Sequence, residues 1–292
     1  MENNFAGNEG MSWVKELALS KCRGAAERGD AAAQTLMGLY YMIEGKDSER
    51  DKNAVKWFMR AASQGYEWGE YMLGLCYEFG VDGNLDHEAA LEWYMRSADG
   101  GNIAALYKIG SCYQTGVGVE SNFDKAVKWY KRAAELGNAE AQIKMGESYR
   151  LGVGVGEDHE AAAEWYRRAA QQGSVEAIFS VGMCYALGLG VERDYAKAMK
   201  WFDMTVEQSQ TEVELCQSEG FSIGWSDDED YERAVVKYSY QVVMGYYYLL
   251  YVISEENPND ELSGNIIENY LNWMRSLGKM GLENKEKARL MR

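Results

Sequence analysis

The two histidines of the chain, His87 and His159, are the first candidates for chemistry, because imidazole serves both as a general base and as a metal ligand. They occupy the same position of a repeated pattern, two copies apart. Since stacked helix pairs lie roughly 10 Å apart, equivalent residues two copies apart are about 20 Å from each other and cannot share a metal ion. We therefore expect both to be exposed residues in the first turn of a helix, and we predict no metal site.

Cysteine is the next candidate, because a thiolate is both a nucleophile and a redox centre. Three of the five cysteines, Cys76, Cys112 and Cys184, share one position of the pattern, and the second halves of the repeats offer no cysteine with which they could pair. Nothing in the sequence suggests the lowered pKa that a redox cysteine requires. We interpret these residues as small buried side chains.

The glycine-rich segments GVGVE, GVGVG and GLGVE have the composition of phosphate-binding loops. They lack the G-x-x-x-x-G-K-[ST] pattern, and they follow a helical pattern where that loop follows a strand, so we interpret them as turns. No pair of carboxylates stands out, and no Ser/His/Asp or Cys/His constellation is evident. The sequence therefore predicts a protein that is not an enzyme, with no catalytic residue and no cofactor.

The elements that carry these residues form an array of repeats with a period of 36 residues. One complete copy, residues 141–173, has two stripes of apolar and small residues at helical spacing with a glycine-rich turn between them. Two series recur without a slip, the tryptophans Trp57, Trp93, Trp129, Trp165 and Trp201 and the glycines Gly38, Gly74, Gly110, Gly146 and Gly182. Such a period indicates an all-α solenoid of antiparallel helix-turn-helix repeats, in which each unit contacts only its neighbours.

The residues around each predicted helix support this arrangement. Small residues in both helices of a copy let the two backbones approach, and the tryptophan is expected to fill the gap beyond them. N-cap side chains for the second helices are expected at Asp86, Asn122, Asp158 and Asp194. Left-handed residues that end these helices are expected at Gly65, Gly101, Gly137 and Gly173.

The pattern divides the chain into four parts. Residues 1–29 are a tail and a capping helix, and residues 30–209 hold five repeats. Residues 210–230 are an acidic insertion; we expect 212–232 to be mobile or to lie across the end of the array, because eight acids with little apolar periodicity cannot bury themselves. Residues 231–292 hold a degenerate sixth repeat and a C-terminal cap.

These motifs resemble the Sel-one-like repeat family, a branch of the tetratricopeptide-like helical solenoids. The resemblance covers about residues 30–209 and rests on an A-x-A-Q-x-x-L-G-x-x-Y helix, a G-x-G-V turn and a D-x-x-K-A-x-x-W-Y-x-x-A-A helix. It is least exact in the first loop and in residues 66–83, where YEWGE and GVDGN replace the usual residues. The resemblance implies a right-handed superhelix that acts as an adaptor or scaffold for other proteins, with no chemistry of its own.

Net charge and hydropathy narrow the choice of partner. A formal charge of −16 repels nucleic-acid phosphates and anionic lipid, so we expect neither as a partner. The N-terminus has no apolar run long enough for a signal peptide, and no stretch approaches the roughly 20 apolar residues of a membrane span. We therefore predict a cytoplasmic protein that binds another protein with a basic or neutral surface.

The candidate binding surface is the part of each first helix that packing does not need, which would line the concave face of the array. It combines an apolar position that recurs along the array with polar residues at its edges, as a groove for a peptide or helix with basic residues requires. The candidate residues are Trp68, Tyr71, Glu78, Tyr107, Gln114, Glu140, Ile143, Glu147, Arg150, Glu176 and Phe179. The alternative is that some of these aromatic residues seal the core between repeats.

Three functional hypotheses remain open. The leading one is a non-catalytic protein-protein interaction scaffold or adaptor that binds its partner through this concave face. A narrower alternative is a cytoplasmic immunity or inhibitor protein for a specific basic effector, motivated by the net charge and the acidic insertion. A third, from another class, is an enzyme or regulator whose activity lies in residues 211–292.

Overall fold

The computed structural model describes residues 19–43 and 48–218, and the structural statements below concern these residues. They are helical or lie in turns and loops, with no β-strand among them. Helical residues 19–27 precede the labelled helices, which are α2 (Ala31–Ile43), α3 (Ser48–Ala62), α4 (Glu67–Phe79), α5 (His87–Asp99), α6 (Ile103–Thr115), α7 (Phe123–Glu135), α8 (Ala139–Leu151), α9 (His159–Ala170), α10 (Val175–Leu187) and α11 (Tyr195–Ser218). The predicted all-α class is confirmed.

The chain divides into two compact units, which we describe separately. The first contains the described residues up to Ser148, together with Gly152–Gly156, and so holds α2 to α7 and most of α8. The second contains Tyr149–Leu151 and the described residues from Glu157 onwards, with α9, α10 and α11.

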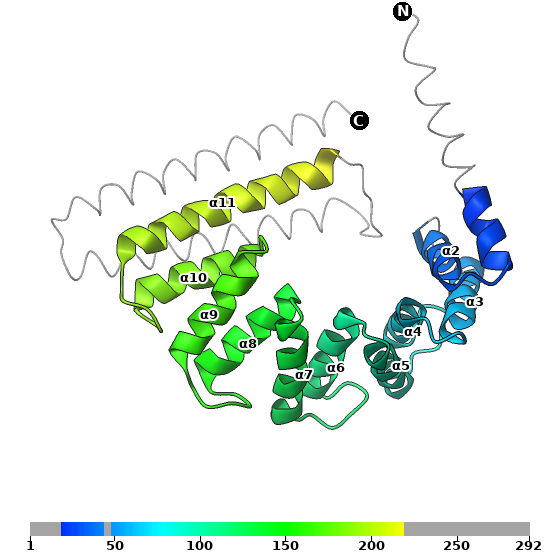
Figure 1. Ribbon diagram of the computed structural model, residues 1–292, viewed down its shortest axis with the longest axis horizontal. Coiled ribbons are helices and arrows are strands. Elements are labelled where there is room, and N and C mark those ends of the chain that lie inside the picture. Colours follow the sequence, from blue (N-terminus) through cyan, green and yellow to red (C-terminus); the bar gives the residue numbers. More distant parts are fainter. Residues whose placement is uncertain (1–18, 44–47, 219–292) are drawn as a thin grey trace, which may run out of the picture. The chain divides into compact units, whose positions relative to one another are not determined.

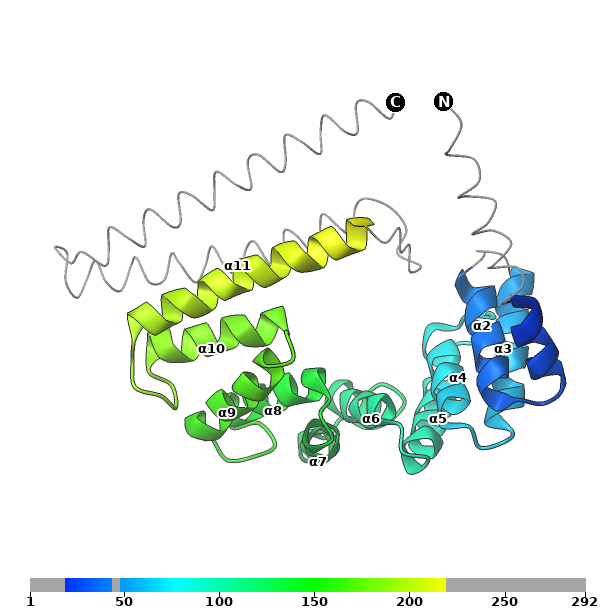
Figure 2. The same cartoon turned by 45° about the horizontal axis from the view of Figure 1, so that its top comes forward.

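Each repeat is a pair of helices, here called helix A and helix B. In the first unit the pairs are α2/α3, α4/α5 and α6/α7, and each later helix A also packs against the helix B before it. The helices therefore follow one another in chain order, which Figure 1 and Figure 2 show from two directions. In the second unit α10 packs on α9 and pairs with α11. These stacked hairpins confirm the predicted solenoid of helix-turn-helix repeats.

Helix A and helix B of a repeat meet at the recurring glycine. A Cβ atom on Gly74 would lie 2.6 Å from the ring of Tyr94, and one on Gly110 would lie 2.6 Å from the ring of Tyr130. The helix-B ring therefore rests directly on the helix-A backbone, and only glycine leaves room for it. The same pairing recurs at Gly38 with Phe58 and at Gly182 with Phe202.

The buried aromatic residue of helix B is not the tryptophan but the residue after it. Tyr94 is 0% exposed and Tyr130 is 2% exposed, whereas Trp93 and Trp129 are half-buried. Adjacent helical residues point about 100° apart, so only one of the two can face helix A directly. The tryptophan was expected to fill the gap beyond the small residues; Trp57 and Trp93 pack, partly buried, against the core there, while the next residue meets the glycine.

Both ends of helix B are fixed as expected. The carboxylate or amide oxygens of Asp86, Asn122, Asp158 and Asp194 accept hydrogen bonds from the backbone N–H three residues later, at 2.9–3.0 Å. The glycines that follow helix B have positive φ angles, which are 72° at Gly65, 96° at Gly101 and Gly137, and 84° at Gly173. The predicted caps are confirmed.

The second glycine of each turn joins one repeat to the next. A Cβ atom on Gly154 would lie 2.7 Å from the carbonyl oxygen of Phe123, at the start of the preceding helix B. In the same way, a Cβ atom on Gly118 would collide with the carbonyl oxygen of His87, and a Cβ atom on Gly190 with that of His159. The glycine-rich segments are therefore turns, as interpreted. His87 and His159 are half-buried, with Nδ1 buried, rather than exposed as expected, because the next repeat's turn covers them.

One position of helix A varies along the array: it is Gln34 and Gln142 in two repeats, Leu106 and Ile178 in two others, and Glu70 in the second. At the glutamine position of the repeat, Gln34 Nε2 donates to the carbonyl of Ala26 at 3.0 Å, and Gln142 Nε2 donates to the carbonyl of Ala134 at 3.1 Å. The second repeat has Glu70 at this position, and its side chain is only 7% exposed. Burial raises the pKa of this carboxyl group, an effect that Arg96 opposes and that Glu67 and Asp99 reinforce.

The last described helix, α11, is 24 residues long and continues to Ser218. The expected boundary between the fifth repeat and the acidic insertion, at residues 209 and 210, does not coincide with a helix end. Where the preceding repeats end helix B with a glycine, this one has Ser209, which has no such preference for the left-handed conformation. The expectations for residues 219–230 and for the sixth repeat in 231–292 lie outside the described residues.

Within the described part of the chain, no helix combines the length and the apolar character needed to cross a bilayer.

Candidate protein-binding surface

The repeated apolar position of helix A has two roles at once. Tyr71 and Tyr107 are half-buried, and their ring centroids lie 5.7 Å from Tyr94 and 5.6 Å from Tyr130. They are therefore packed on the buried rings of helix B while keeping one side accessible. In the second unit Phe179 lies in the same way 5.3 Å from Phe202.

Ile143, at the same position of α8, is only 6% exposed and belongs to the core. The position was expected to form a continuous accessible strip. Ile143 contributes little to such a surface, because its shorter side chain does not reach past the packed atoms. In the first unit, the accessible aromatic members of this position are therefore Tyr71 on α4 and Tyr107 on α6.

Two accessible aromatic residues lie at the two ends of α4. Trp68 is 47% exposed and stands edge-on to Tyr71, with ring centroids 5.9 Å apart. Phe79, the last residue of α4, is 67% exposed, and the Nζ atom of Lys108 on α6 lies 5.4 Å from its ring centroid. Phe79 was not among the predicted residues. The signal that could have found it is a bulky apolar residue directly before the glycine that ends helix A.

Glu78 lies between these aromatic residues, and both oxygens of its carboxylate group already have partners. The hydroxyl group of Tyr94 donates a hydrogen bond to it, and Lys108 Nζ lies 3.0 Å from each of its carboxylate oxygens. Burial, and next the bond to Glu78, raise the pKa of Tyr94 well above its ordinary value. Because Lys108 neutralises Glu78, this part of the surface carries little net charge.

Gln114 repeats the arrangement on α6, where it accepts a hydrogen bond of 2.6 Å from the hydroxyl group of Tyr130. In two other repeats, helix B has phenylalanine in place of this tyrosine, so there is no hydroxyl group that needs an acceptor. Their residues at the position of Glu78 and Gln114 are apolar, namely Met42 beside the Phe58 repeat and Ala186 beside the Phe202 repeat. The polar residue of helix A therefore serves the buried tyrosine first and a partner only second.

The other predicted polar residues differ in how available they are. Glu147 is paired with Lys144 at 2.7 Å, and both side chains are about one-third exposed. Glu140, in the first unit, is exposed. In the second unit, Arg150 is exposed and Glu176 is half-buried. The first unit thus brings together Trp68, Tyr71, Glu78, Tyr107 and Gln114 on α4 and α6, whereas Arg150, Glu176 and Phe179 belong to the second unit.

The cysteines do not have the properties of reactive thiols. Burial raises the pKa of Cys76 to about 12 and the pKa values of Cys112 and Cys184 to about 11. All three are buried and free, so they are small core side chains, as interpreted. Across the described residues, no three His, Cys, Asp or Glu side chains lie together in a way that could hold a metal ion. The hypothesis of activity in residues 211–292 concerns a segment that lies mostly outside the described residues.

Helix pairs that stack on their neighbours in chain order define an α-solenoid repeat protein. The family model of the Sel1 repeat matches residues 31–66, 69–102, 103–138, 139–174 and 175–209. This protein belongs to the Sel1 repeat family. The predicted family is confirmed, and proteins of this family are generally scaffolds for protein interactions.

Two solved structures illustrate the similarity. A protective antigen present in uropathogenic Escherichia coli strains, which displays an SLR fold, matches with 31% identity and a TM-score of 0.62 over 90% of this chain and 56% of the antigen. The chain thus spans little more than half of the antigen's length. A Sel1 repeat protein from Oxalobacter formigenes matches with 26% identity and a TM-score of 0.57 over 76% of this chain and 98% of that one. No curated protein gives a significant match.

Proposed function

We propose that this protein is a non-catalytic scaffold or adaptor, and that it binds a protein segment through the surface formed by Trp68, Tyr71, Phe79 and Tyr107. The observation that carries the proposal is the exposure of two large aromatic side chains on one helix, 47% at Trp68 and 67% at Phe79. Aromatic residues of this kind anchor protein interfaces, where a few side chains supply most of the binding free energy.

The spacing of the two anchors suggests the form of the partner. They lie eleven residues apart on α4, and a rise of 1.5 Å per residue separates them by about 16 Å. A partner helix can place apolar side chains at that separation about eleven positions apart, and an extended segment comes near it with side chains about four or six positions apart, which share one face. Tyr71 lies between the anchors and offers a flat, half-buried surface to the middle of the segment.

The charges around the surface favour apolar contact over strong charge pairing. Glu78 and Glu147 were expected to attract basic residues, but each is paired with a lysine of the same surface. Glu140 is the exposed carboxylate of the group. A basic residue at one margin of the partner therefore adds to binding, while the apolar anchors determine most of it.

The net charge of −16 favours one narrower form of this function, in which the partner is a basic effector protein that the scaffold caps and inhibits. Strong charge attraction speeds association and weakens as salt is added. Binding that persists at physiological ionic strength but whose association rate falls steeply as salt is added would support the inhibitor form. An association rate that is insensitive to salt would support the apolar adaptor.

The proposal can be tested with a display library of random peptide segments, selected on the full-length protein. Segments enriched by the wild-type protein should show two apolar positions at one of the expected spacings. The variants Trp68→Ser, Phe79→Ser and Tyr107→Ala should each weaken binding of a selected segment by about tenfold. A matched control is Leu136→Ser, which removes a side chain that is 58% exposed on a different part of the first unit.

Two results would count against the proposal. One is a library from which no segment binds more tightly to the wild-type protein than to Phe79→Ser. The other is a selected segment whose binding weakens equally with Leu136→Ser. Because Tyr107 also packs on Tyr130, its variant is interpreted only if thermal unfolding shows that the fold remains at the assay temperature.

A further inference from the structure

Helix B carries a second regular feature, a row of arginines stacked on tryptophans. The Cζ atoms of Arg60, Arg96 and Arg132 each lie 4.6 Å from the ring centroid of the tryptophan three residues earlier in the helix. The stacked residues are Trp57, Trp93 and Trp129. All three pairs lie in the first unit, one on each successive helix B, so the same guanidinium geometry recurs at a fixed interval along the array.

These guanidinium groups are exposed, and among the described residues none of the three forms a hydrogen bond or an ion pair through its side chain. The fourth member, Arg168 in the second unit, differs: it lies 4.7 Å from the Trp165 centroid and its Nε atom is 3.1 Å from Glu164. Stacking holds a guanidinium plane in place but leaves its N–H edge open, and that edge matches a carboxylate with two parallel hydrogen bonds.

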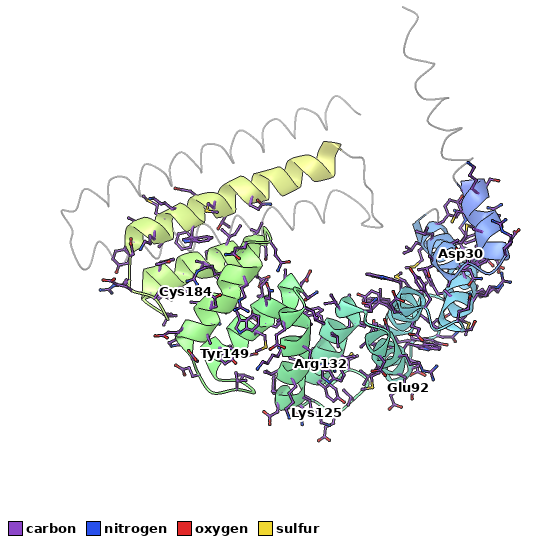
Figure 3. All side chains as sticks on the ribbon, viewed as in Figure 1. Asp30, Glu92, Lys125, Arg132, Tyr149 and Cys184 are labelled. Atoms are coloured by element: carbon purple, nitrogen blue, oxygen red, sulfur yellow. The ribbon has the colours of Figure 1, made fainter. Side chains whose placement is uncertain are left out.

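The surroundings of the row are basic at both ends, although the chain as a whole is acidic. The helices α3 and α7 each carry four Lys or Arg residues against two Asp or Glu residues. Figure 3 shows Lys125 and Arg132 on α7, where Lys125 is itself 5.2 Å from the Tyr113 ring centroid. The middle helix, α5, is more acidic, and Arg96 lies within electrostatic range of buried Glu70.

We propose that this row is a second binding surface, on the helix-B side, and that it holds an acidic, extended segment of a partner protein by its carboxylates. Repeats stack at roughly 10 Å, which equals about one turn of an extended chain in the polyproline II conformation, where every third side chain points to the same side. The segment it fits therefore has an acidic side chain at every third residue. Arg60 and Arg132 supply most of the attraction, and Arg96 supplies less because Glu70 partly compensates its charge.

This surface is independent of the apolar one on helix A, so the two proposals can fail separately. The probe is a fluorescent peptide with glutamate at every third position in a Ser/Thr background, and its comparison is a peptide of equal composition with adjacent glutamates. Fluorescence anisotropy with the full-length protein should show the spaced peptide binding about tenfold more tightly than the comparison. Binding should weaken as salt is added, because exposed charges are screened.

Variants identify the residues responsible. Arg132→Gln and Arg60→Gln should each weaken binding of the spaced peptide by about tenfold, and Arg96→Gln by less. Arg132→Lys keeps the charge but loses the stacked planar group, so it should also weaken binding severalfold. Arg168→Gln is the matched control and should change nothing, because Glu164 already occupies that guanidinium group.

Each other outcome would overturn the proposal. No binding of the spaced peptide, or equal binding of the two peptides, would show that the row recognises no carboxylate spacing. Equal binding of single-stranded DNA with the same charge would show nonspecific attraction of polyanions. Arginine variants that bind normally but unfold at lower temperature would show that the stacked pairs only stabilise helix B.

Discussion

The ring of Tyr94 occupies the space that a side chain on Gly74 would need, since a Cβ atom there would be 2.6 Å from it. This contact sets the distance between the two helices of the second repeat. It also places the Tyr94 hydroxyl group beside Glu78, at the edge of the proposed binding surface. The spacing of the hairpin and the position of a candidate site residue therefore depend on one glycine.

Gly74→Ala should destabilise the protein by about 1–3 kcal/mol, because the added methyl group must displace a fully buried ring. The free energy of unfolding can be measured by chemical denaturation. Gly156→Ala is the control, since no heavy atom lies within 4 Å of a Cβ atom placed there. Equal stability of the two variants would contradict this description of the hairpin interface.

The two aromatic residues at the centre of α7 should differ in importance. Tyr130 is 2% exposed, whereas Trp129 is half-buried. Tyr130→Ala should therefore cost about 3–5 kcal/mol of stability. Trp129→Ala should cost about 2 kcal/mol, because less apolar surface is lost from the core. Hydrogen exchange can show whether the adjacent helices also lose protection, as expected of an array stabilised by stacking. A larger loss of stability for Trp129→Ala than for Tyr130→Ala would show that the tryptophan is the core residue.

Glu70→Gln should stabilise the protein at neutral pH by about 1 kcal/mol, because an amide can donate the hydrogen bond that Gln34 and Gln142 make at this position. Burial raises the pKa of Glu70 in the folded state above its ordinary value of 4.5, so the folded state holds the proton more tightly than the unfolded state. The contribution of Glu70 to the stability of the wild-type protein is therefore fully present below pH 4.5. This contribution is lost as the pH rises through the raised pKa.

The stability difference between Glu70→Gln and the wild-type protein should therefore shrink as the pH is lowered towards 4.5. Thermal unfolding over a range of pH measures it. Glu120→Gln is the control, because Glu120 is exposed and is not among the charged groups that shift the pKa of Glu70. A difference that stays constant across this range would show that Glu70 does not titrate within it.

The buried cysteines should resist alkylation in the folded protein. The thiolate is the reactive form, and the raised pKa values, about 12 for Cys76 and about 11 for Cys112 and Cys184, keep these groups protonated near neutral pH. Peptide-resolved mass spectrometry after iodoacetamide treatment should show little labelling at these sites without denaturant and complete labelling with it. Rapid labelling of Cys112 in the folded state would contradict its burial.

The sequence predicted those features that depend on position within the period. Equivalent residues recur in equivalent places, so the hairpins, the N-caps such as Asp158 and the terminating glycines such as Gly137 could be assigned. The period does not show which side of a helix faces its neighbour most closely. The sequence therefore did not show that Tyr130 is more deeply buried than Trp129.

The candidate site was predicted less completely for a related reason. Periodicity selected Tyr71, Tyr107, Ile143 and Phe179 as one set, but their exposure depends on side-chain length and on the helix-B ring beneath each of them. Phe79 and Lys108 have no aromatic or basic counterpart in every repeat, so a search for recurring residues passes over them. The pairing of Glu78 with Lys108 joins different repeats and depends on how the two helices stack.

Each turn contacts the start of the preceding helix B, and this contact gives the array a direction. Gly118 covers His87, Gly154 covers Phe123, and Gly190 covers His159, so the covering residue always belongs to the later repeat. During synthesis the start of each second helix stays open to solvent until the following hairpin has left the ribosome. Gene duplications or deletions of a whole 36-residue unit keep every such contact, whereas changes of another length break one. Arrays of this kind are therefore free to lengthen or shorten only in whole repeats.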